Sequence, residues 1–310
     1  MRQLLTRVAL TVPVVWLVVS LVFLLIHLVP GDPILQMLGE GATPADINAL
    51  RHQYFLDLPL PEQYMRYWSG VLHGDLGSSI RLHDSVINLI AMRYPYTMAL
   101  TLTALGVGLL LALPAGILAA VRRGRWLDQV LSMVSLFGLS VPGLALGPVL
   151  ILVFSIHLGW LPVSGANAEG GKEIDWTYLV LPALAMGASL AAILTRMVRT
   201  AMLEELNQDY IRTARAKGLS EMAVVCRHAL PNALVPIVTV VGLQFGALLA
   251  GAIVTETIFS WPGLGRLVVS AIANRDYALV QGCLLSIGLT YVLVNLLTDV
   301  VYRWVNPRMR

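Results

Sequence analysis

The chain has 310 residues, of which 57% are hydrophobic and 13% are charged, and its formal net charge at pH 7 is +3. Soluble domains carry about 25% charged residues, so this shortage of charge excludes an ordinary soluble protein and indicates a lipid bilayer as the solvent. The two cysteines, Cys226 and Cys283, lack the spacing of a metal motif, so we predict neither a disulfide nor a metal site.

Six stretches are long and apolar enough to cross a membrane as helices, which takes about 20 mostly apolar residues. They lie at about 8–28, 97–121, 133–157, 178–198, 234–256 and 279–302. None alternates with the two-residue period of a membrane β-barrel. We therefore predict an all-α polytopic membrane protein with six transmembrane helices. The first apolar run is longer than the roughly 7–15 residues of a cleavable signal peptide, so we expect that helix to be retained.

The first connection, about residues 30–95, carries signals for short helices. Thr43 and Pro44 form a capping and first-turn pair. The segment 61–74 places its aromatic residues and Leu72 near one helical face, and aromatic residues suit a membrane interface. We expect two or three short helices that lie on the outer membrane surface.

Basic residues near the span ends predict the orientation, because cytoplasmic loops carry an excess of Lys and Arg. They gather before the first span, at 122–125, at 196–227 and after the last span. We therefore predict that both termini and the connection between the fourth and fifth spans face the cytoplasm.

Polar groups are scarce inside the predicted spans, which argues against a carrier driven by intramembrane ionisable residues. His157, Glu256 and Asp299 fall near predicted span ends, where we expect water to reach them. Gln244 lies deeper, and it either bonds a neighbouring helix or lines a transport path.

Small residues recur at spacings that let helix backbones approach closely in a membrane. Examples are the series that begins at Gly242 and the glycines Gly106, Gly108 and Gly116. This pattern is equally compatible with contacts inside the chain and with a subunit interface.

The connection at about 199–234 is polar, basic and rich in helix formers. Residues 210–217 predict about two turns of helix, with a cap at Asn207 or Asp209 and a left-handed stop at Gly218. We expect this short helix to lie crosswise between two longer ones beneath the membrane.

The short helix has two unlike sets of side chains. Arg212, Arg215 and Lys217 ring it, whereas Ala214 and Ala216 are small enough for another backbone to approach. A rigid helix of this kind is suited to transmit force from a soluble partner. A polybasic patch attracted to anionic lipid is the alternative.

The connection after the fifth span contains Trp261, Pro262 and Gly263, which predict a tight aromatic turn. Two interpretations stay open. The turn either anchors the chain at the membrane interface, or it forms part of an outer gate or a contact with a binding protein.

The connection at 199–234 resembles the EAA loop of bacterial ABC importer permeases, whose pattern is E-A-A-x-x-x-G-x9-I-x-L-P. The matching positions are Arg212, Thr213 and Ala214 for E-A-A, then Gly218, then Leu230 with Pro231. Arg212 in place of Glu and His228 in place of Ile depart from the pattern.

Other segments, from VPGDP after the first span to NLLTDVVYRWVNPRMR at the end, are similar to the peptide/nickel branch of that family and to its B-type dipeptide permease subunits. The resemblance implies the type I ABC importer transmembrane-domain fold. It also implies a first helix and outer segment at 1–93, a permease domain at 94–303 and a cytoplasmic tail at 304–310.

The short helix would then be the coupling helix, docked in a groove of an ATPase whose closure biases inward-open and outward-open states. The residues that the resemblance implies in ATPase coupling are Asp209, Tyr210, Arg212, Thr213, Ala214, Arg215, Ala216, Lys217, Gly218, Leu219, Leu230 and Pro231. The candidates for the pathway or outer gate are Gln244, Trp261, Pro262 and Gly263.

The resemblance implies a multi-pass protein of the bacterial inner membrane with four kinds of partner. These are a second homologous permease subunit, one or two kinds of P-loop ATPase, an extracytoplasmic solute-binding protein and membrane lipid; we expect no nucleic-acid partner. The implied cargo is a small peptide such as a dipeptide, an oligopeptide or glutathione. A nickel-chelate importer and a stand-alone secondary carrier are the alternatives.

The positions of the lysines indicate that this chain is not itself an ATPase. Lys172 and Lys217 are its only two lysines, and neither stands in the Gly-Lys-Ser/Thr motif of a P-loop. We therefore expect no catalytic residues and no cofactor in this chain, with ATP and magnesium acting in the partner subunits.

Overall fold

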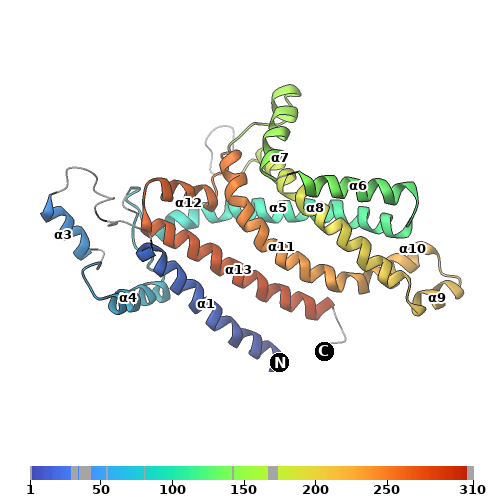
Figure 1. The fold of residues 1–310 in the computed structure, drawn as a ribbon, viewed down its shortest axis with the longest axis horizontal. Helices are drawn as coiled ribbons and strands as arrows, with labels where there is room; N and C mark the ends of the chain where they lie inside the picture. The colour runs from blue at the N-terminus through green and yellow to red at the C-terminus, as the bar shows by residue number, and fades with distance from the viewer. Residues whose placement is uncertain are drawn as a thin grey trace. The chain divides into compact units, whose positions relative to one another are not determined.

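The computed structural model describes residues 2–28, 34, 43–53, 55–79, 81–141, 143–166 and 174–305. In these ranges the regular elements are helices, apart from one isolated bridge between Ser78 and Ser85. The elements, drawn in Figure 1, are α1 (Arg2–Leu28), α3 (Pro44–Gln53), α4 (Leu60–His73), α5 (Val86–Val121), α6 (Trp126–Ser140), α7 (Gly143–Leu150), the π-helix η1 (Ile151–His157), α8 (Trp176–Leu206), α9 (Asp209–Ala216), α10 (Glu221–Ala223), the π-helix η2 (Val224–Ala229), α11 (Leu230–Ile258), α12 (Leu264–Ala273) and α13 (Tyr277–Val305).

Four helical stretches in the described part of the chain are long and apolar enough to cross a membrane. They are Val86–Val121, Trp176–Leu206, Glu221–Ile258 and Tyr277–Tyr302, which cover the second, fourth, fifth and sixth predicted spans. The first predicted span coincides with α1. Within α1, the apolar stretch Leu10–Leu24 is shorter than the four stretches above. The prediction of an all-helical membrane protein is confirmed.

The third predicted span, 133–157, is not one straight helix. Helix α6 ends at Ser140, and the helices from Gly143 to His157 continue at an angle of 99° to it. Val141 has an extended backbone, with φ −79° and ψ 120°. A proline follows Val141 in the sequence, and the residue before a proline is driven out of the helical region.

The chain folds as two compact units. One comprises residues 1–96 and 262–292, and the other comprises 97–261 and 293–310. The segment 262–292 thus joins the first helices, although it follows the fifth span in sequence. The division at residues 93 and 94 that the family resemblance implies stays a prediction, and residues 306–310 of the predicted tail lie outside the described residues.

In the first unit, α4 packs against α1. The Phe23 ring lies 5.3 Å from the Tyr64 ring and 5.7 Å from the Tyr67 ring, and Ser20 Oγ is 2.7 Å from the Tyr64 hydroxyl. The aromatic face of 61–74 therefore covers another helix. Leu72, predicted on that face, is exposed, and Val71 packs there instead because it lies three residues from Trp68.

In the second unit, α8 lies among α5, α6, α7 and α11. A Cβ added at Gly116 of α5 would lie 2.6 Å from Val198 Cβ and 2.8 Å from the Thr195 carbonyl oxygen, both in α8. A Cβ added at Gly242 of α11 would clash with the Thr298 side chain of α13. These glycines therefore make contacts inside the chain, whereas a Cβ at Gly106 would meet no atom within 4 Å.

The Glu256 carboxyl group is fully buried in the second unit, so the expectation that water reaches it is wrong. Thr97 of α5 donates a hydrogen bond of 2.5 Å to Glu256 Oε1. Glu256 is thus removed from solvent although it lies near the end of α11. The position of Glu256 near the end of its helix therefore did not indicate exposure.

Candidate functional site

Helix α9 is the short crosswise helix predicted between the fourth and fifth spans, and it begins at Asp209. Its N-cap is Gln208, with φ −72° and ψ 151°, and no side chain caps it. The predicted caps, Asn207 and Asp209, are therefore wrong. Asn207 ends α8, where its amide donates to the Leu203 carbonyl, and Asp209 occupies the first helical position, where a negative charge suits the helix dipole.

Gly218 stops α9 in the left-handed conformation, with φ +79°, as predicted. The Gly218 amide donates to the Arg215 carbonyl at 2.9 Å, and the Leu219 amide donates to the Ala214 carbonyl at 3.4 Å. These two bonds form the Schellman arrangement that closes many helices. The turn fixes the direction in which the chain leaves α9 and enters α10.

The inward face of α9 consists of Ile211 and Ala214, which are buried in the core of the second unit. That core includes residues of α8, such as Met202, and residues of α11, such as Ile237. Ala214 was predicted to let another backbone approach, and the resemblance placed it among the coupling residues, but its methyl group packs in the chain's own core. Helical spacing of three residues puts Ile211 and Ala214 on the same face, which explains the difference.

The outward face of α9 and its following turn carries most of the predicted coupling residues. The exposed ones are Asp209, Tyr210, Arg212, Thr213, Arg215, Ala216, Lys217, Gly218 and Leu219. Leu230 is half-buried against the core, and Pro231 is exposed in the first turn of α11. The structure thus brings the predicted set together in one region, with Ala214 beneath it.

Tyr210 ties α9 to the helices before and after it. Its hydroxyl donates to Glu205 Oε2 at 2.5 Å, and the Asn232 amide donates to the same hydroxyl at 3.0 Å. The Asn232 amide also donates to the His228 carbonyl at 3.1 Å. Side-chain hydrogen bonds of Tyr210 therefore connect α9 to both α8 and α11.

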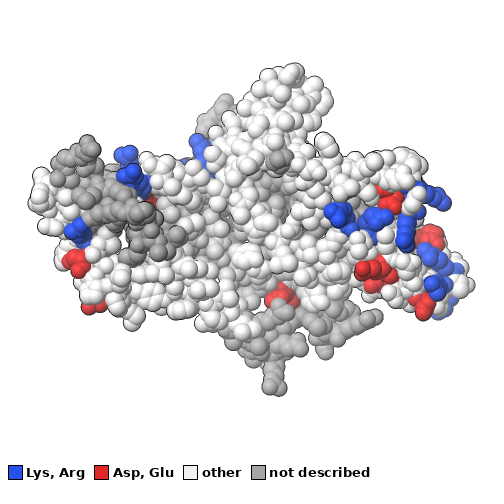
Figure 2. Space-filling view, in the orientation of Figure 1, with Lys and Arg blue, Asp and Glu red and all other residues white. Residues whose placement is uncertain are grey.

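The charges around α9 are of both signs, as Figure 2 shows at the α9 end of the molecule. Arg212 pairs with Asp209 at 3.2 Å, and Arg215 makes a two-point ion pair with Glu221 at 2.7 and 3.2 Å. Between residues 204 and 228 the sequence holds four acidic and four basic side chains, counting Asp, Glu, Lys and Arg. This balance is unlike a polybasic lipid-binding segment, which attracts anionic lipid through excess positive charge.

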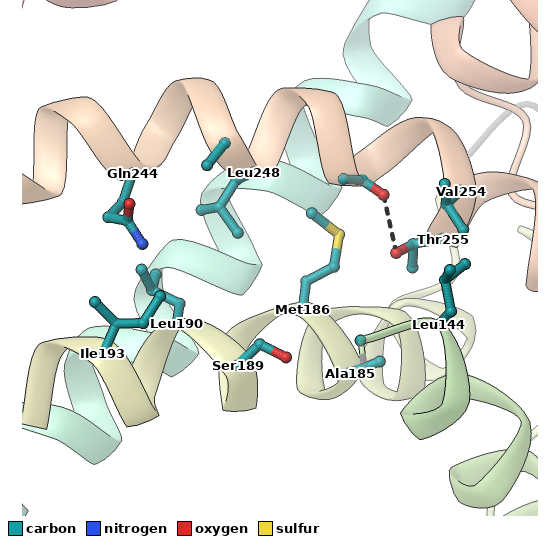
Figure 3. A pocket seen from close by; sticks show the side chains of 13 residues that line it. Leu144, Ala185, Met186, Ser189, Leu190, Ile193, Gln244, Leu248, Val254 and Thr255 are labelled. Atoms are coloured by element: carbon teal, nitrogen blue, oxygen red, sulfur yellow. Dashed lines mark hydrogen bonds between the residues drawn. The ribbon is translucent and has the colours of Figure 1, made fainter. Parts of the chain in front are cut away.

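A pocket of about 340 Å³ lies between α7, α8 and α11. Its lining is mostly apolar, and its polar side chains are Ser189, Gln244 and Thr255. The Gln244 side chain points from α11 toward Leu190 and Ile193 of α8 (Figure 3). Of the two interpretations of Gln244, its place in this lining favours a path-lining role, which stays a prediction.

The turn at Trp261 is closed by Ser260, which takes the left-handed conformation with φ +51°. The Trp261 amide donates to the Glu256 carbonyl at 2.8 Å, and the Ser260 amide donates to the Thr257 carbonyl at 3.3 Å. The Trp261 side chain is fully buried, so it is not an exposed anchor at the membrane interface. Gly263 is the N-cap of α12 and Pro262 is half-buried.

Metal-binding groups do not gather in the described part of the chain. No set of three or more His, Cys, Asp or Glu side chains there could hold a metal ion.

Known relatives of the chain are permeases. It is 44% identical over 299 residues to the glutathione transport system permease protein GsiC of Escherichia coli O6:H1. The aligned residues cover 96% of this chain and 95% of the relative. The GsiC proteins of Escherichia coli K12 and Shigella dysenteriae serotype 1 are each 43% identical over the same shares of both chains.

Solved structures support the same fold. A chain of the MetNI methionine ABC transporter in an inward-facing conformation has a TM-score of 0.56 at 22% identity, covering 70% of this chain and 96% of that chain. A chain of an amino acid ABC transporter has a TM-score of 0.52 at 16% identity, covering 71% of this chain and 94% of that chain. These likenesses establish the ABC importer transmembrane-domain fold.

Two family models together cover nearly the whole sequence. The model for the N-terminal part of binding-protein-dependent transport system membrane components matches residues 1–101, and the model for the inner membrane component itself matches residues 112–310. Membership implies ATPase and binding-protein partners in an ABC transporter of the inner membrane, with ATP hydrolysis outside this chain. The chain therefore belongs to the family of binding-protein-dependent transport system inner membrane components.

Proposed function

We propose that this chain is the permease of an importer for glutathione or closely similar short peptides. The observation that carries this proposal is the 44% identity to a glutathione permease over 96% of the chain. A nickel chelate is less well supported, because the described residues offer no cluster of metal ligands along a path. The chain forms half of the path, and a second, homologous permease supplies the other half.

The proposed orientation places both termini and α9 in the cytoplasm and the first connection outside. It is supported by the Arg residues at 122–125 and around α9. One or two kinds of P-loop ATPase then meet α9 and use ATP and magnesium, and the solute-binding protein delivers cargo from the other side. Pro262 and Gly263 stay candidates for the outer gate with Trp261.

The packing of α9 suggests how ATPase closure reaches the path. Ile211 and Ala214 are seated in a core shared with α8 and α11, and Tyr210 is bonded to Glu205 and Asn232 on either side. The same two helices line the pocket that contains Gln244. A push on α9 therefore moves both pocket walls, and α9 would dock differently in the inward-open and outward-open states.

Uptake measurements test the cargo. The chain is expressed together with a partner permease, an ATPase and a solute-binding protein in a bacterium that lacks glutathione and peptide importers. We expect ATP-dependent uptake of labelled glutathione, competed by short peptides. Competition by nickel chelates alone would favour a metal importer, and uptake by the purified chain alone in vesicles would favour a stand-alone carrier.

Removing the basic side chains of α9 should weaken the ATPase contact. For the double variant Arg212→Ala and Arg215→Ala, we expect about tenfold less ATPase to co-purify, because exposed charge pairs contribute up to about 1 kcal/mol each. The control is Arg123→Ala with Arg125→Ala, two exposed arginines in another connection. Equal recovery of ATPase from both double variants would leave lipid attraction as the better interpretation.

Replacing Gly218 should uncouple transport from ATP hydrolysis. A Cβ at Gly218 meets no atom within 4 Å, so the effect of Gly218→Leu comes from backbone strain at φ +79° and not from a clash. That strain is about 1–2 kcal/mol, enough to lower uptake about tenfold while membrane insertion stays normal. Gly218→Asn is the control, since Asn tolerates this conformation, and normal uptake by both variants would contradict the assignment.

A further inference from the structure

A second pocket, of about 310 Å³, lies in the first unit. Its walls come from α1, from the residues after α3, from one face of α4, from the turn after α4 and from the start of α13. We name it the outer-segment pocket, because most of its lining belongs to residues 55–78. The coupling helix α9 and the pocket that contains Gln244 belong to the second unit. Neither the coupling surface nor the proposed path therefore accounts for the outer-segment pocket.

The lining of the outer-segment pocket combines apolar side chains with one charge of each sign. Arg66 and Asp75 both line it and are both exposed. No ion pair joins Arg66 to Asp75 among the ion pairs of the described residues. The Asp57 carboxylate also lies near Arg66, but His52 Nδ1 is 2.7 Å from it and Asp57 does not line the pocket. A ligand that carries both charges can therefore pair with Arg66 and Asp75 at once.

Phe55, in the wall of this pocket, has a strained backbone. Its φ is +56°, in the left-handed region that favours glycine at the residue after a helix. The Phe55 amide closes α3 by donating to the His52 carbonyl at 3.1 Å. Phe55 is 43% exposed, and Arg66 Cζ lies 4.2 Å from the centre of its ring. A bulky aromatic residue held exposed in a glycine conformation gains little for folding, and strain of this kind gathers at ligand sites.

Hydrogen bonds hold the walls in place. The Asp75 amide donates to the Gly70 carbonyl at 2.9 Å, and Asp75 Oδ1 accepts from the Gly77 amide at 2.9 Å. Gln281 Nε2 donates to the Val22 carbonyl at 3.2 Å, which joins α13 to α1 behind the pocket. The pocket is therefore preformed, as ligand sites usually are.

We propose that the outer-segment pocket binds a small zwitterion, with its anionic group at Arg66, its ammonium group at Asp75 and its apolar body against Phe55. A volume of about 310 Å³ is at the lower end of the range for ligand pockets and suits a molecule of about dipeptide size. Two sources offer this chemistry: a free short peptide, and the phosphoethanolamine headgroup of a membrane lipid. The inference does not rest on the proposed cargo, because α9 and the Gln244 pocket take no part in it.

Peptide binding is the first test. The chain is purified with a partner permease and an ATPase, without a solute-binding protein, in nanodiscs of phosphatidylglycerol alone. We expect saturable binding of tritiated alanyl-phenylalanine in equilibrium dialysis, with a Kd at least tenfold higher for Arg66→Gln and for Asp75→Asn. Asn keeps the oxygen that accepts from the Gly77 amide, so the turn is preserved. The controls are Glu62→Gln and Arg81→Gln, two exposed residues of the same connection that do not line the pocket.

Modified probes test which charge meets which side chain. N-acetyl-alanyl-phenylalanine lacks the ammonium group, so it should bind at least tenfold more weakly, and Asp75→Asn should weaken it no further. The C-terminal amide of alanyl-phenylalanine lacks the carboxylate, and Arg66→Gln should likewise have no further effect on it. Losses that multiply fully in both pairs would show that these side chains do not meet the ligand charges.

The lipid source is tested with the same variants. If alanyl-phenylalanine does not bind, native mass spectrometry of the complex from membranes that contain phosphatidylethanolamine should show one retained molecule of this lipid per copy of the chain. Arg66→Gln and Asp75→Asn should each lose it, whereas the two controls should keep it. Peptide affinity and lipid retention that are unchanged in both pocket variants, or the absence of both ligands from the unmodified chain, would overturn the proposal. Should one pocket variant give a low yield, the other decides.

Discussion

Gly116→Leu should prevent the second unit from packing and give little folded protein. A Cβ at this position would lie 2.6 Å from Val198 Cβ and Cγ1 and 2.8 Å from the Thr195 carbonyl oxygen. The carbonyl belongs to the α8 backbone, so it cannot move aside as a flexible side chain can. Overpacking of this kind lowers stability by about 1–3 kcal/mol or more, and here it separates two helices along their length.

The matched control for Gly116→Leu is Gly106→Leu in the same helix. A Cβ at Gly106 meets no atom within 4 Å. Leu also favours the helix over Gly by about 1 kcal/mol. We expect Gly106→Leu to match the unmodified chain in yield and thermal stability in detergent, and Gly116→Leu to aggregate. Equal thermal stability of the two variants would show that α5 and α8 do not meet at Gly116.

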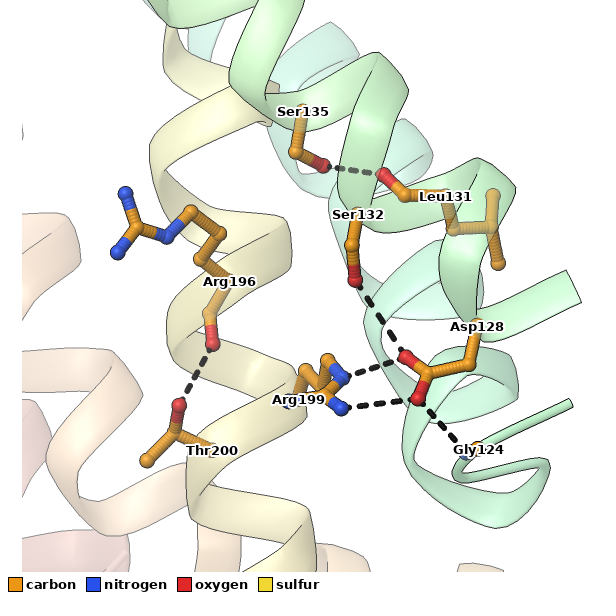
Figure 4. Close-up of polar contacts among 8 residues, drawn as sticks. All are labelled: Gly124, Asp128, Leu131, Ser132, Ser135, Arg196, Arg199 and Thr200. Atoms are coloured by element: carbon orange, nitrogen blue, oxygen red, sulfur yellow. Dashed lines mark hydrogen bonds and ion pairs between the residues drawn. The ribbon is translucent and has the colours of Figure 1, made fainter. Parts of the chain in front are cut away.

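Asp128→Ala should loosen the junction of α6 and α8. Asp128 accepts from Arg199 Nε at 2.6 Å and Nη2 at 2.9 Å, from the Gly124 amide at 2.9 Å and from Ser132 Oγ at 3.4 Å (Figure 4). The Asp128 side chain is 7% exposed and the Arg199 side chain is 30% exposed. Because Arg199 can recover part of its hydration, we expect a loss of about 2–3 kcal/mol, less than for a fully buried pair.

Thermal unfolding in detergent measures this loss, and a double-mutant cycle assigns it to the pair. Arg199→Ala leaves Asp128 with its bonds to Gly124 and Ser132, so it should cost less than Asp128→Ala. The double variant should cost less than the sum of the two single variants, since neither charge is then left alone. Strictly additive losses would mean that the ion pair does not stabilise the junction.

The sequence predicted those features, such as helices and helix ends, that depend on residues close together in the chain. The lengths of the apolar runs predicted helices, because a backbone in lipid must satisfy its own hydrogen bonds and therefore becomes helical. The third run is the exception to a single helix, since it is bent after Ser140. Gly218 predicted a left-handed stop because glycine has no Cβ and adopts that conformation at little steric cost. Ser260 takes the same conformation, although no glycine at that position signals it.

The faces of the helices were less predictable. Small and apolar residues on α9 indicated a contact, but the sequence did not indicate whether Ala214 meets a partner or the chain's own core. The pairing of Asp128 with Arg199 joins residues 71 positions apart, and the sequence carries no signal for it. The bend after Ser140 was signalled by the proline at 142, yet the long apolar run concealed it.

The sequence by itself determined that the chain belongs in a lipid bilayer, that it is helical, which family it resembles and where the short helix α9 lies, since these follow from composition, run length and local motifs. The tertiary structure alone decided which glycines carry close contacts, that Glu256 and Trp261 are buried, and that α9 is seated between α8 and α11. The physical reason is that burial and pairing depend on distances between residues far apart in the chain. Those distances are set only when the helices pack.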